Sequence, residues 1–167
     1  TRANAAWTEA CRLGLEGLIC KRIDAPYTGG RSNTWLKLKC RPRQEFVVGG
    51  YTINSVSSHQ LRSLMVGLWE DGKFVYAGKV GTGFNAFAHQ VLMKRLKPLH
   101  IDAMPFATLP APSGRFSRPA GASVWVKPEV VVEVAYAGWT ADKLLRQASY
   151  LGLREDKPAS AVRKEVS

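Results

Sequence analysis

Three side chains in the first quarter of the chain have the types and spacing to bind a phosphate group and a metal ion. Glu16 opens the segment Glu-Gly-Leu-Ile-Cys-Lys, which ends at Lys21, and a later segment, Trp35-Leu-Lys-Leu-Lys, alternates leucines with Lys37 and Lys39. Alternate side chains of a strand share a face, so the two ammonium groups are expected about 7 Å apart. That spacing suits phosphate oxygens. The pattern predicts a site for a phosphorylated ligand, with Glu16 as a candidate metal ligand.

The composition is that of a folded, strongly basic protein. The 167 residues are 46% hydrophobic, and 24 Lys and Arg against 13 Asp and Glu give a formal net charge of +11. This hydrophobic fraction supports a core, and the charge favours a polyanionic partner, with nucleic acid first. The alternative is a role in solubility alone. Residues 1–43 hold nine basic and three acidic side chains, so the charge is densest around the lysine motif.

The cysteines and histidines predict neither a disulfide framework nor a zinc site. Cys11, Cys20 and Cys40 are odd in number and lack Cys-x-x-Cys spacing, and the three histidines are scattered. A reducing cytosol fits such a set. The sequence has no apolar run near the roughly 20 residues of a membrane span, and residue 1 begins without a signal-like segment. We therefore expect a soluble cytoplasmic protein that does not contact a membrane.

The pattern before residue 43 predicts a small α+β segment. Apolar spacing favours a helix over 4–15, and strands are expected over 17–22 and 34–39. One helix and two strands bury too little surface to offset chain entropy. The segment either packs on the remainder or is the end of a domain that begins upstream. Arg41-Pro42-Arg43 then predicts an exposed hinge or linker.

The region after this linker is expected to be mainly β. Strands are predicted over 45–51, 62–69, 74–80, 123–126 and 130–139, with a helix over 84–96 after the third. Five strands with a helix at that place match the OB-fold, a Greek-key barrel that often binds oligonucleotides, and an SH3-like barrel is the alternative. Residues 105–121 are expected to form a long loop with four prolines, and a charged tail is expected from Arg154 onward.

The order of these motifs resembles that of the covalent nucleotidyltransferases, which comprise ATP-dependent DNA ligases, RNA ligases and mRNA capping enzymes. Residues 16–21, 35–39 and 152–157, the last reading Gly-Leu-Arg-Glu-Asp-Lys, resemble the fourth, fifth and sixth motifs of that superfamily. Within it, the chain is similar to the ligase module of bacterial DNA ligase D, the end-joining enzyme. The likeness extends along nearly the whole chain, including Phe46-Val-Val-Gly-Gly-Tyr51, Tyr76-Ala-Gly-Lys-Val-Gly-Thr-Gly-Phe84 and Trp125-Val-Lys-Pro-Glu129.

The resemblance implies a reaction in three steps. A lysine attacks the α-phosphate of ATP, the AMP moves to a 5′-phosphate at a nick, and the 3′-hydroxyl displaces AMP to seal the strand. By this resemblance Lys37 and Lys39 contact the α-phosphate, and Arg154 and Lys157 contact the outgoing pyrophosphate. The implied cofactors are ATP and Mg²⁺ or Mn²⁺. The resemblance also assigns Glu16 to the cation, Lys21 to nucleotide binding, and Asp156 to orienting the neighbouring cations or the nucleotide.

The chain departs from the family in one respect that governs activity. The nucleophilic lysine of the family lies in a Lys-x-Asp-Gly motif, and no such sequence occurs in these 167 residues. The third motif is absent too. We therefore expect a fragment that binds DNA and is inactive alone, with 1–42 as the end of an adenylation domain and 43–167 as the OB-fold DNA-binding domain.

The resemblance also implies partners for this fragment. They are nicked or broken double-stranded DNA in the bacterial nucleoid, the upstream adenylation domain, and an end-joining polymerase and end-binding proteins. The candidate DNA-contacting side chains are Arg31, Arg41, Arg43, Arg115 and Arg118. Two alternatives remain open, a stand-alone OB-fold nucleic-acid-binding module without catalysis and a nucleotidyltransferase of the RNA-ligase or capping type.

Overall fold

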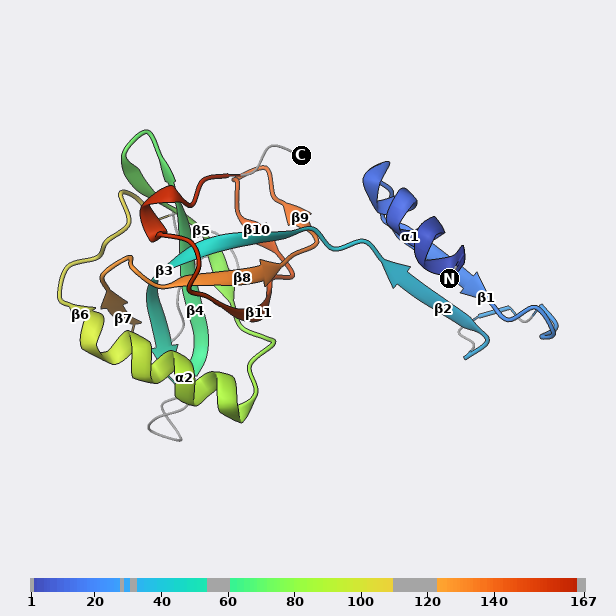
Figure 1. The fold of residues 1–167 in the computed structure, drawn as a ribbon, viewed down its shortest axis with the longest axis horizontal. Coiled ribbons are helices and arrows are strands. Elements are labelled where there is room, and N and C mark those ends of the chain that lie inside the picture. The colour runs from blue at the N-terminus through green and yellow to red at the C-terminus, as the bar shows by residue number, and fades with distance from the viewer. Residues whose placement is uncertain (1, 28, 31–32, 54–60, 110–122, 165–167) are drawn as a thin grey trace. The chain divides into compact units, whose positions relative to one another are not determined.

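The chain divides between Pro42 and Arg43 into two compact units, Thr1–Pro42 and Arg43–Ser167 (Figure 1). The computed structural model describes residues 2–27, 29–30, 33–53, 61–109 and 123–164. Among these described residues, no helix is long and apolar enough to cross a membrane.

The described residues of the N-terminal unit form one helix and a β-hairpin. Helix α1 (Arg2–Arg12) is followed by β1 (Gly17–Lys21) and β2 (Trp35–Lys39), which pair antiparallel. The helix is three residues shorter at its C-terminal end than the expected 4–15. It ends there because Gly14 adopts a φ of 72°, a left-handed conformation that favours glycine and closes helices.

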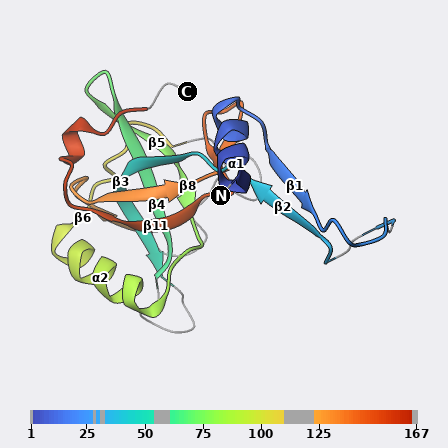
Figure 2. The same cartoon turned by 45° about the vertical axis from the view of Figure 1, so that its right-hand side comes forward.

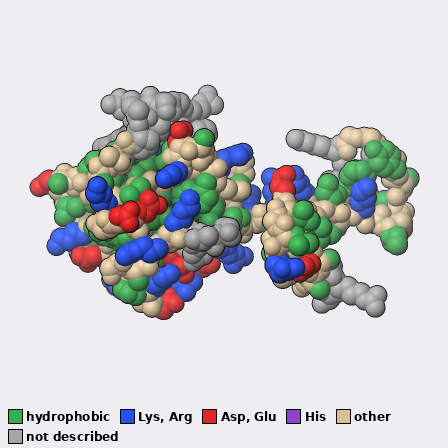
Figure 3. All heavy atoms as spheres, turned by 90° about the horizontal axis from the view of Figure 1, so that it is seen from above, with side chains coloured by type: hydrophobic (Ala, Val, Ile, Leu, Met, Phe, Trp, Pro, Cys, Tyr) green, Lys and Arg blue, Asp and Glu red, His purple; other side chains and the backbone are tan. Residues whose placement is uncertain are grey.

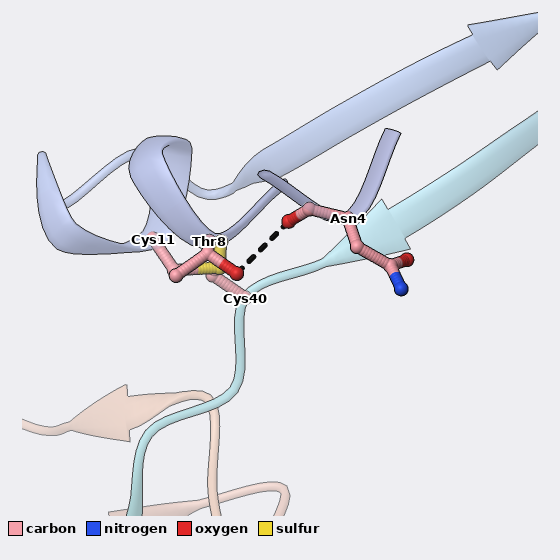
Figure 4. The surroundings of a disulfide bond; sticks show 4 residues. All are labelled: Asn4, Thr8, Cys11 and Cys40. Carbon is pink, nitrogen blue, oxygen red and sulfur yellow. Dashed lines mark hydrogen bonds between the residues drawn. A yellow bond between two sulfur atoms is a disulfide. The ribbon is translucent and has the colours of Figure 1, made fainter. Parts of the chain in front are cut away.

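A disulfide bond joins the last turn of α1 to the residue that follows β2. Cys11 and Cys40 form this bond across a sequence separation of 29, and Cys20 is free (Figure 4). The expectation that the cysteines would form no disulfide is therefore wrong, because only the fold brings these two together. A cross-link over a loop of this length is worth about 3–4 kcal/mol in the chain-entropy model. The cysteines also give no support to a reducing compartment, where disulfides are rare.

The C-terminal unit is built mainly of strands. The long strands are β3 (Arg43–Ile53), β4 (Leu61–Glu70) and β5 (Lys73–Val80), followed by helix α2 (Ala86–Leu96). These elements confirm the expected first three strands and the helix. The remaining elements are a 3-10 helix (Lys97–Leu99), β6 (His100–Ile101), β7 (Ser123–Val126), β8 (Val131–Ala135), β9 (Gly138–Trp139), β10 (Leu145–Arg146), β11 (Ser149–Arg154) and a second 3-10 helix (Ala159–Ala161).

Strand β3 organises this unit because it pairs with two different strands along one edge. Its first half, Arg43–Val47, pairs with β8, and its second half, Gly50–Thr52, pairs with β7, while β4 covers its other edge along most of its length. The main path of the sheet is β11-β8-β3-β4-β5. A strand shared in this way bends the sheet into the partly open Greek-key barrel of the OB-fold, as expected, with α2 across one end (Figure 2).

The barrel closes around a dense core at the bend of β3. Phe46, Val48, Leu64 and Val66 are fully buried, and a side chain on Gly49 would overlap the rings of the aromatic residues packed against it. The glycine is needed there because interiors are packed too tightly for an added methyl group.

Strand β11 is the main correction to the expected fold. The residues from 149 to 154 pair with β8, so Arg154 ends a strand where a charged tail was expected to begin. The backbone N–H of Tyr150 donates to the carbonyl of Thr82 at 2.9 Å, which fixes β11 beside the loop after β5. The strand expected over 130–139 is interrupted after Ala135, and Gly138 has a φ of 153°.

Candidate functional site

Glu16, Lys37 and Lys39 lie together at one end of the N-terminal hairpin. The register pairs Lys37 with Ile19 and Lys39 with Gly17, so both lysines lie on one face, as predicted. Lys37 Nζ donates to Glu16 Oε1 at 3.0 Å, and Lys39 Nζ lies 3.9 Å from the same oxygen. The backbone N–H of Cys40 donates to the backbone carbonyl of Glu16. This hydrogen bond holds Glu16 beside the end of β2.

The charges of this cluster suit an anionic ligand. The hydrogen bond from Lys37, followed by the charges of Lys37 and Lys39, lowers the pKa of Glu16 from its ordinary value. Two ammonium groups against one carboxylate leave one positive charge in excess. The three side chains are largely exposed, so their pairing adds little to stability and leaves them free to exchange partners with phosphate oxygens.

Glu16 is suited to bind a divalent cation only together with the phosphate oxygens of a ligand. Within the part of the chain that the structure describes, no group of three or more His, Cys, Asp and Glu lies close enough to hold a metal ion. Both lysines approach Oε1 of Glu16, and no described residue donates to its Oε2. Since Mg²⁺ keeps several waters and is commonly bound by one carboxylate plus substrate phosphates, this donor set suits a phosphate-bound cation.

Lys21 lies farther along the same face. Its ammonium group is 4.4 Å from the centroid of the Trp35 ring, and the ring of Tyr27 packs against Trp35 at 5.5 Å between centroids. The cation–π contact fixes the charge of Lys21 beside an aromatic surface. From the sequence, Lys21 was predicted to contact the nucleotide. Its contact with Trp35, and that of Trp35 with Tyr27, were not predicted.

The second predicted cluster lies in the C-terminal unit, where Arg154 and Lys157 are held by carboxylates. Arg154 Nε and Nη2 donate to the two oxygens of Asp156 at 2.9 and 2.8 Å. Arg154 Nη1 lies 3.3 Å from Glu45 Oε1 and 3.8 Å from Glu133 Oε2, and Lys157 Nζ donates to Glu45 Oε2 at 3.1 Å. The structure therefore brings the three predicted residues together and adds Glu45 and Glu133.

These contacts hold the acids in their ionised form. The bidentate hydrogen bond from Arg154 lowers the pKa of Asp156 to about 2. The hydrogen bond from Lys157 lowers the pKa of Glu45 against the opposing effect of burial. Glu45 was not predicted from the sequence, and the available signal was a single carboxylate in the apolar segment Glu45-Phe46-Val47-Val48.

The predicted DNA-contacting arginines are only partly within the described chain. Arg41 and Arg43 are exposed, and neither forms an ion pair with a described residue. Arg31, Arg115 and Arg118 lie outside the described residues. On the face of the C-terminal unit seen in Figure 3, Lys and Arg side chains are interspersed with acidic ones, so no single basic patch marks a DNA-binding surface there.

The fold and the two clusters together define a class of protein. A lysine-bearing hairpin followed by an OB-fold barrel that ends in an Arg-x-Asp-Lys segment is the architecture expected of the C-terminal part of a nucleotidyltransferase. The family model described as "ATP dependent DNA ligase C terminal region" matches residues 57–157, more than half of the chain. The chain belongs to this family.

Curated relatives agree with this family. The chain is 45% identical over 159 residues to a "Multifunctional non-homologous end joining protein LigD" of Pseudomonas aeruginosa, which covers 93% of this chain and 18% of the relative. It is 40% identical over 154 residues to the protein of the same name in Mycobacterium bovis, covering 91% of this chain and 20% of the relative. The chain therefore spans about a fifth of the length of these relatives.

Solved structures share this fold. The ligase domain of M. tuberculosis LigD matches with a TM-score of 0.67 at 38% identity, over 97% of this chain and 52% of that one. A Lig E DNA ligase matches with a TM-score of 0.51 at 21% identity, over 91% of this chain and 45% of that one. The second likeness shows the fold alone.

Proposed function

We propose that this chain is the C-terminal part of an ATP-dependent DNA ligase that seals nicks and joins ends in DNA repair. In this proposal residues 1–42 are the end of an adenylation domain and residues 43–167 are the DNA-binding domain. The observation that carries it is the pair of lysines with Glu16 on one hairpin, followed by the OB-fold unit with Arg154 and Lys157. The names of the similar LigD proteins support a role in end joining.

Each cluster has a defined part in this proposal. Lys37 and Lys39 bind the α-phosphate of ATP and offset the negative charge that develops on it, which is the use of preorganised cations that accelerates phosphoryl-type chemistry. Glu16 and ligand phosphates hold a divalent cation such as Mg²⁺ or Mn²⁺, which supplies further charge neutralisation. Arg154 and Lys157 contact the outgoing pyrophosphate, and Asp156 orients Arg154.

The chain alone is expected to form no covalent AMP adduct. Its sequence has no Lys-x-Asp-Gly segment to supply the nucleophile. Incubation with labelled ATP and Mg²⁺, followed by denaturing electrophoresis, should leave the 167-residue chain unlabelled. A longer protein that joins this chain to its upstream region is the positive control. A labelled band on the chain itself would contradict the assignment of the nucleophile to the upstream domain.

Binding of nicked duplex DNA is expected to depend steeply on salt. If the contacts are mainly to phosphates, raising the salt from about 50 to about 200 mM should weaken binding by about a hundredfold or more. Arg43→Ala should reduce the slope of log K against log salt by about one. Arg12→Ala is the matched control because Arg12 is already paired with Glu9.

Fluorescence anisotropy of a labelled nicked duplex measures this slope. Salt-independent binding, or no binding, would count against the DNA-binding role of the OB-fold unit. Competition by nicked RNA of the same sequence separates the DNA-ligase proposal from an RNA-ligase or capping function, because nicked DNA should compete better.

A further inference from the structure

Glu45 connects the two cations of the C-terminal cluster through separate oxygens. Its Oε1 faces Arg154 Nη1 at 3.3 Å, and its Oε2 accepts a hydrogen bond from Lys157 Nζ at 3.1 Å. The carboxylate belongs to β3, the strand shared by the barrel, and only 15% of its side chain is exposed. Glu45 is therefore a fixed group against which both cations are held.

The donors of Arg154 are already directed at carboxylates. Nε and Nη2 form the bidentate bond to Asp156, and Nη1 lies between Glu45 and Glu133. Counting Lys157, two positive charges face three negative ones. This excess of negative charge disfavours an incoming anion, so a phosphate that binds Arg154 and Lys157 competes with these carboxylates.

The geometry indicates which carboxylate a phosphate would replace. Asp156 lies two residues from Arg154 and moves with it, whereas Glu45 and Glu133 are directly opposite each other on the paired strands β3 and β8. Of these two, Glu45 approaches both cations, and Glu133 approaches only Arg154 at 3.8 Å. Glu45 is therefore the carboxylate whose release frees both cations together.

Space for an anion lies beside the cluster. A hollow of about 310 Å³ is bordered by Arg154 and Lys157 and, on its other sides, by side chains that include Arg95, Glu129 and Glu155. The hollow opens to solvent next to the two cations that Glu45 holds.

We propose that Glu45 is a positioning residue that competes with phosphate for Arg154 and Lys157 and thereby sets their affinity for a pyrophosphate-like anion. This inference rests on the proposed function, which assigns the two cations to pyrophosphate. Glu45 holds Arg154 and Lys157 against the barrel until the oxygens of an anionic ligand replace its two carboxylate oxygens. Removing its charge should therefore strengthen binding, whereas loss of a merely structural contact would weaken it.

The test measures binding of inorganic pyrophosphate to the 167-residue chain by titration calorimetry at fixed ionic strength. Glu45→Gln keeps the shape of the side chain and removes the charge, and we expect binding about five- to tenfold tighter than in the unsubstituted chain. Glu155→Gln is the matched control, since Glu155 borders the same hollow but pairs with Arg95. It should change the affinity less than about twofold.

Lys157→Ala in the Glu45→Gln background should abolish the gain. Equal or weaker binding of pyrophosphate by the Glu45→Gln chain, with an unchanged fold by circular dichroism, would overturn the inference. Failure of the proposed function has a different signature. A longer protein with Arg154→Ala would then adenylate normally, while the tighter binding caused by Glu45→Gln in the chain would persist and still support the competition.

Discussion

Lys39→Ala in a longer protein that contains this chain and its upstream region should reduce formation of the lysyl-AMP adduct by about 10²–10³-fold. This is the loss that follows removal of one preorganised group from developing negative charge. Lys39 is the better target of the two lysines, because its ammonium group lies 3.9 Å from Glu16 while Lys37 is hydrogen-bonded to that carboxylate at 3.0 Å. The amine of Lys39 is thus the more available to phosphate.

Labelled AMP transfer under single-turnover conditions measures this effect. The fold should be retained, because Lys39 is exposed and its ion pair adds little stability. Lys73→Ala is the matched control, since Lys73 is an exposed strand lysine in the other unit and forms no ion pair with a described residue. Lys39→Arg keeps the charge and should recover part of the rate. Adenylation by Lys39→Ala at the normal rate would remove Lys39 from the nucleotide site.

The sequence was sufficient to predict features that depend on local patterns. Period-two alternation placed Lys37 and Lys39 on one face, and the register of β1 with β2 agrees. The dipeptide Asp71-Gly72, a strong hairpin signal, lies between the antiparallel strands β4 and β5. Hydrophobic periodicity also located the first three strands of the OB-fold, β3 to β5, and its helix α2. These features depend on neighbours within a few residues, and local chemistry therefore determines them.

Features that depend on distant parts of the chain were missed. Glu45 and Lys157 are 112 residues apart and meet only because β3, β8 and β11 are adjacent in the sheet. Strand β11 was not predicted, and its last residue, Arg154, was interpreted as the start of a charged tail, yet the charge of Arg154 is balanced by Glu45 and Glu133. The Cys11–Cys40 bond likewise requires the fold of the N-terminal unit.

Arg154→Ala should both impair adenylation and destabilise the OB-fold unit. In the longer protein we expect loss of about 10²-fold or more in adduct formation, because a cation assigned to the leaving group is removed. In the 167-residue chain the change leaves Glu45 and Glu133 facing each other on paired strands without the guanidinium between them. Like charges directly opposite each other destabilise a sheet, so the melting temperature should fall.

The loss of stability should depend on pH in a defined direction. The pKa of Glu45 lies below its ordinary value of 4.5 in the folded chain. A carboxyl group lowered in this way stabilises the fold above its unfolded pKa, and the contribution disappears as the pH falls through the folded value. Arg154→Ala should therefore lower the melting temperature most near pH 7, and its effect should shrink as the pH falls through the lowered pKa of Glu45. Arg146→Ala, an exposed strand arginine without a side-chain partner among the described residues, should show neither effect.

A second substitution separates the role of Arg154 in stability from its role in adenylation. Glu133→Gln added to Arg154→Ala removes one of the two opposed charges, so the melting temperature at pH 7 should recover toward that of the unsubstituted chain. Adenylation by the longer protein should not recover, because no cation has been returned to the pyrophosphate. If the double variant regained adenylation along with stability, Arg154 would act only by balancing the acids of the barrel, and its assignment to the nucleotide would be wrong.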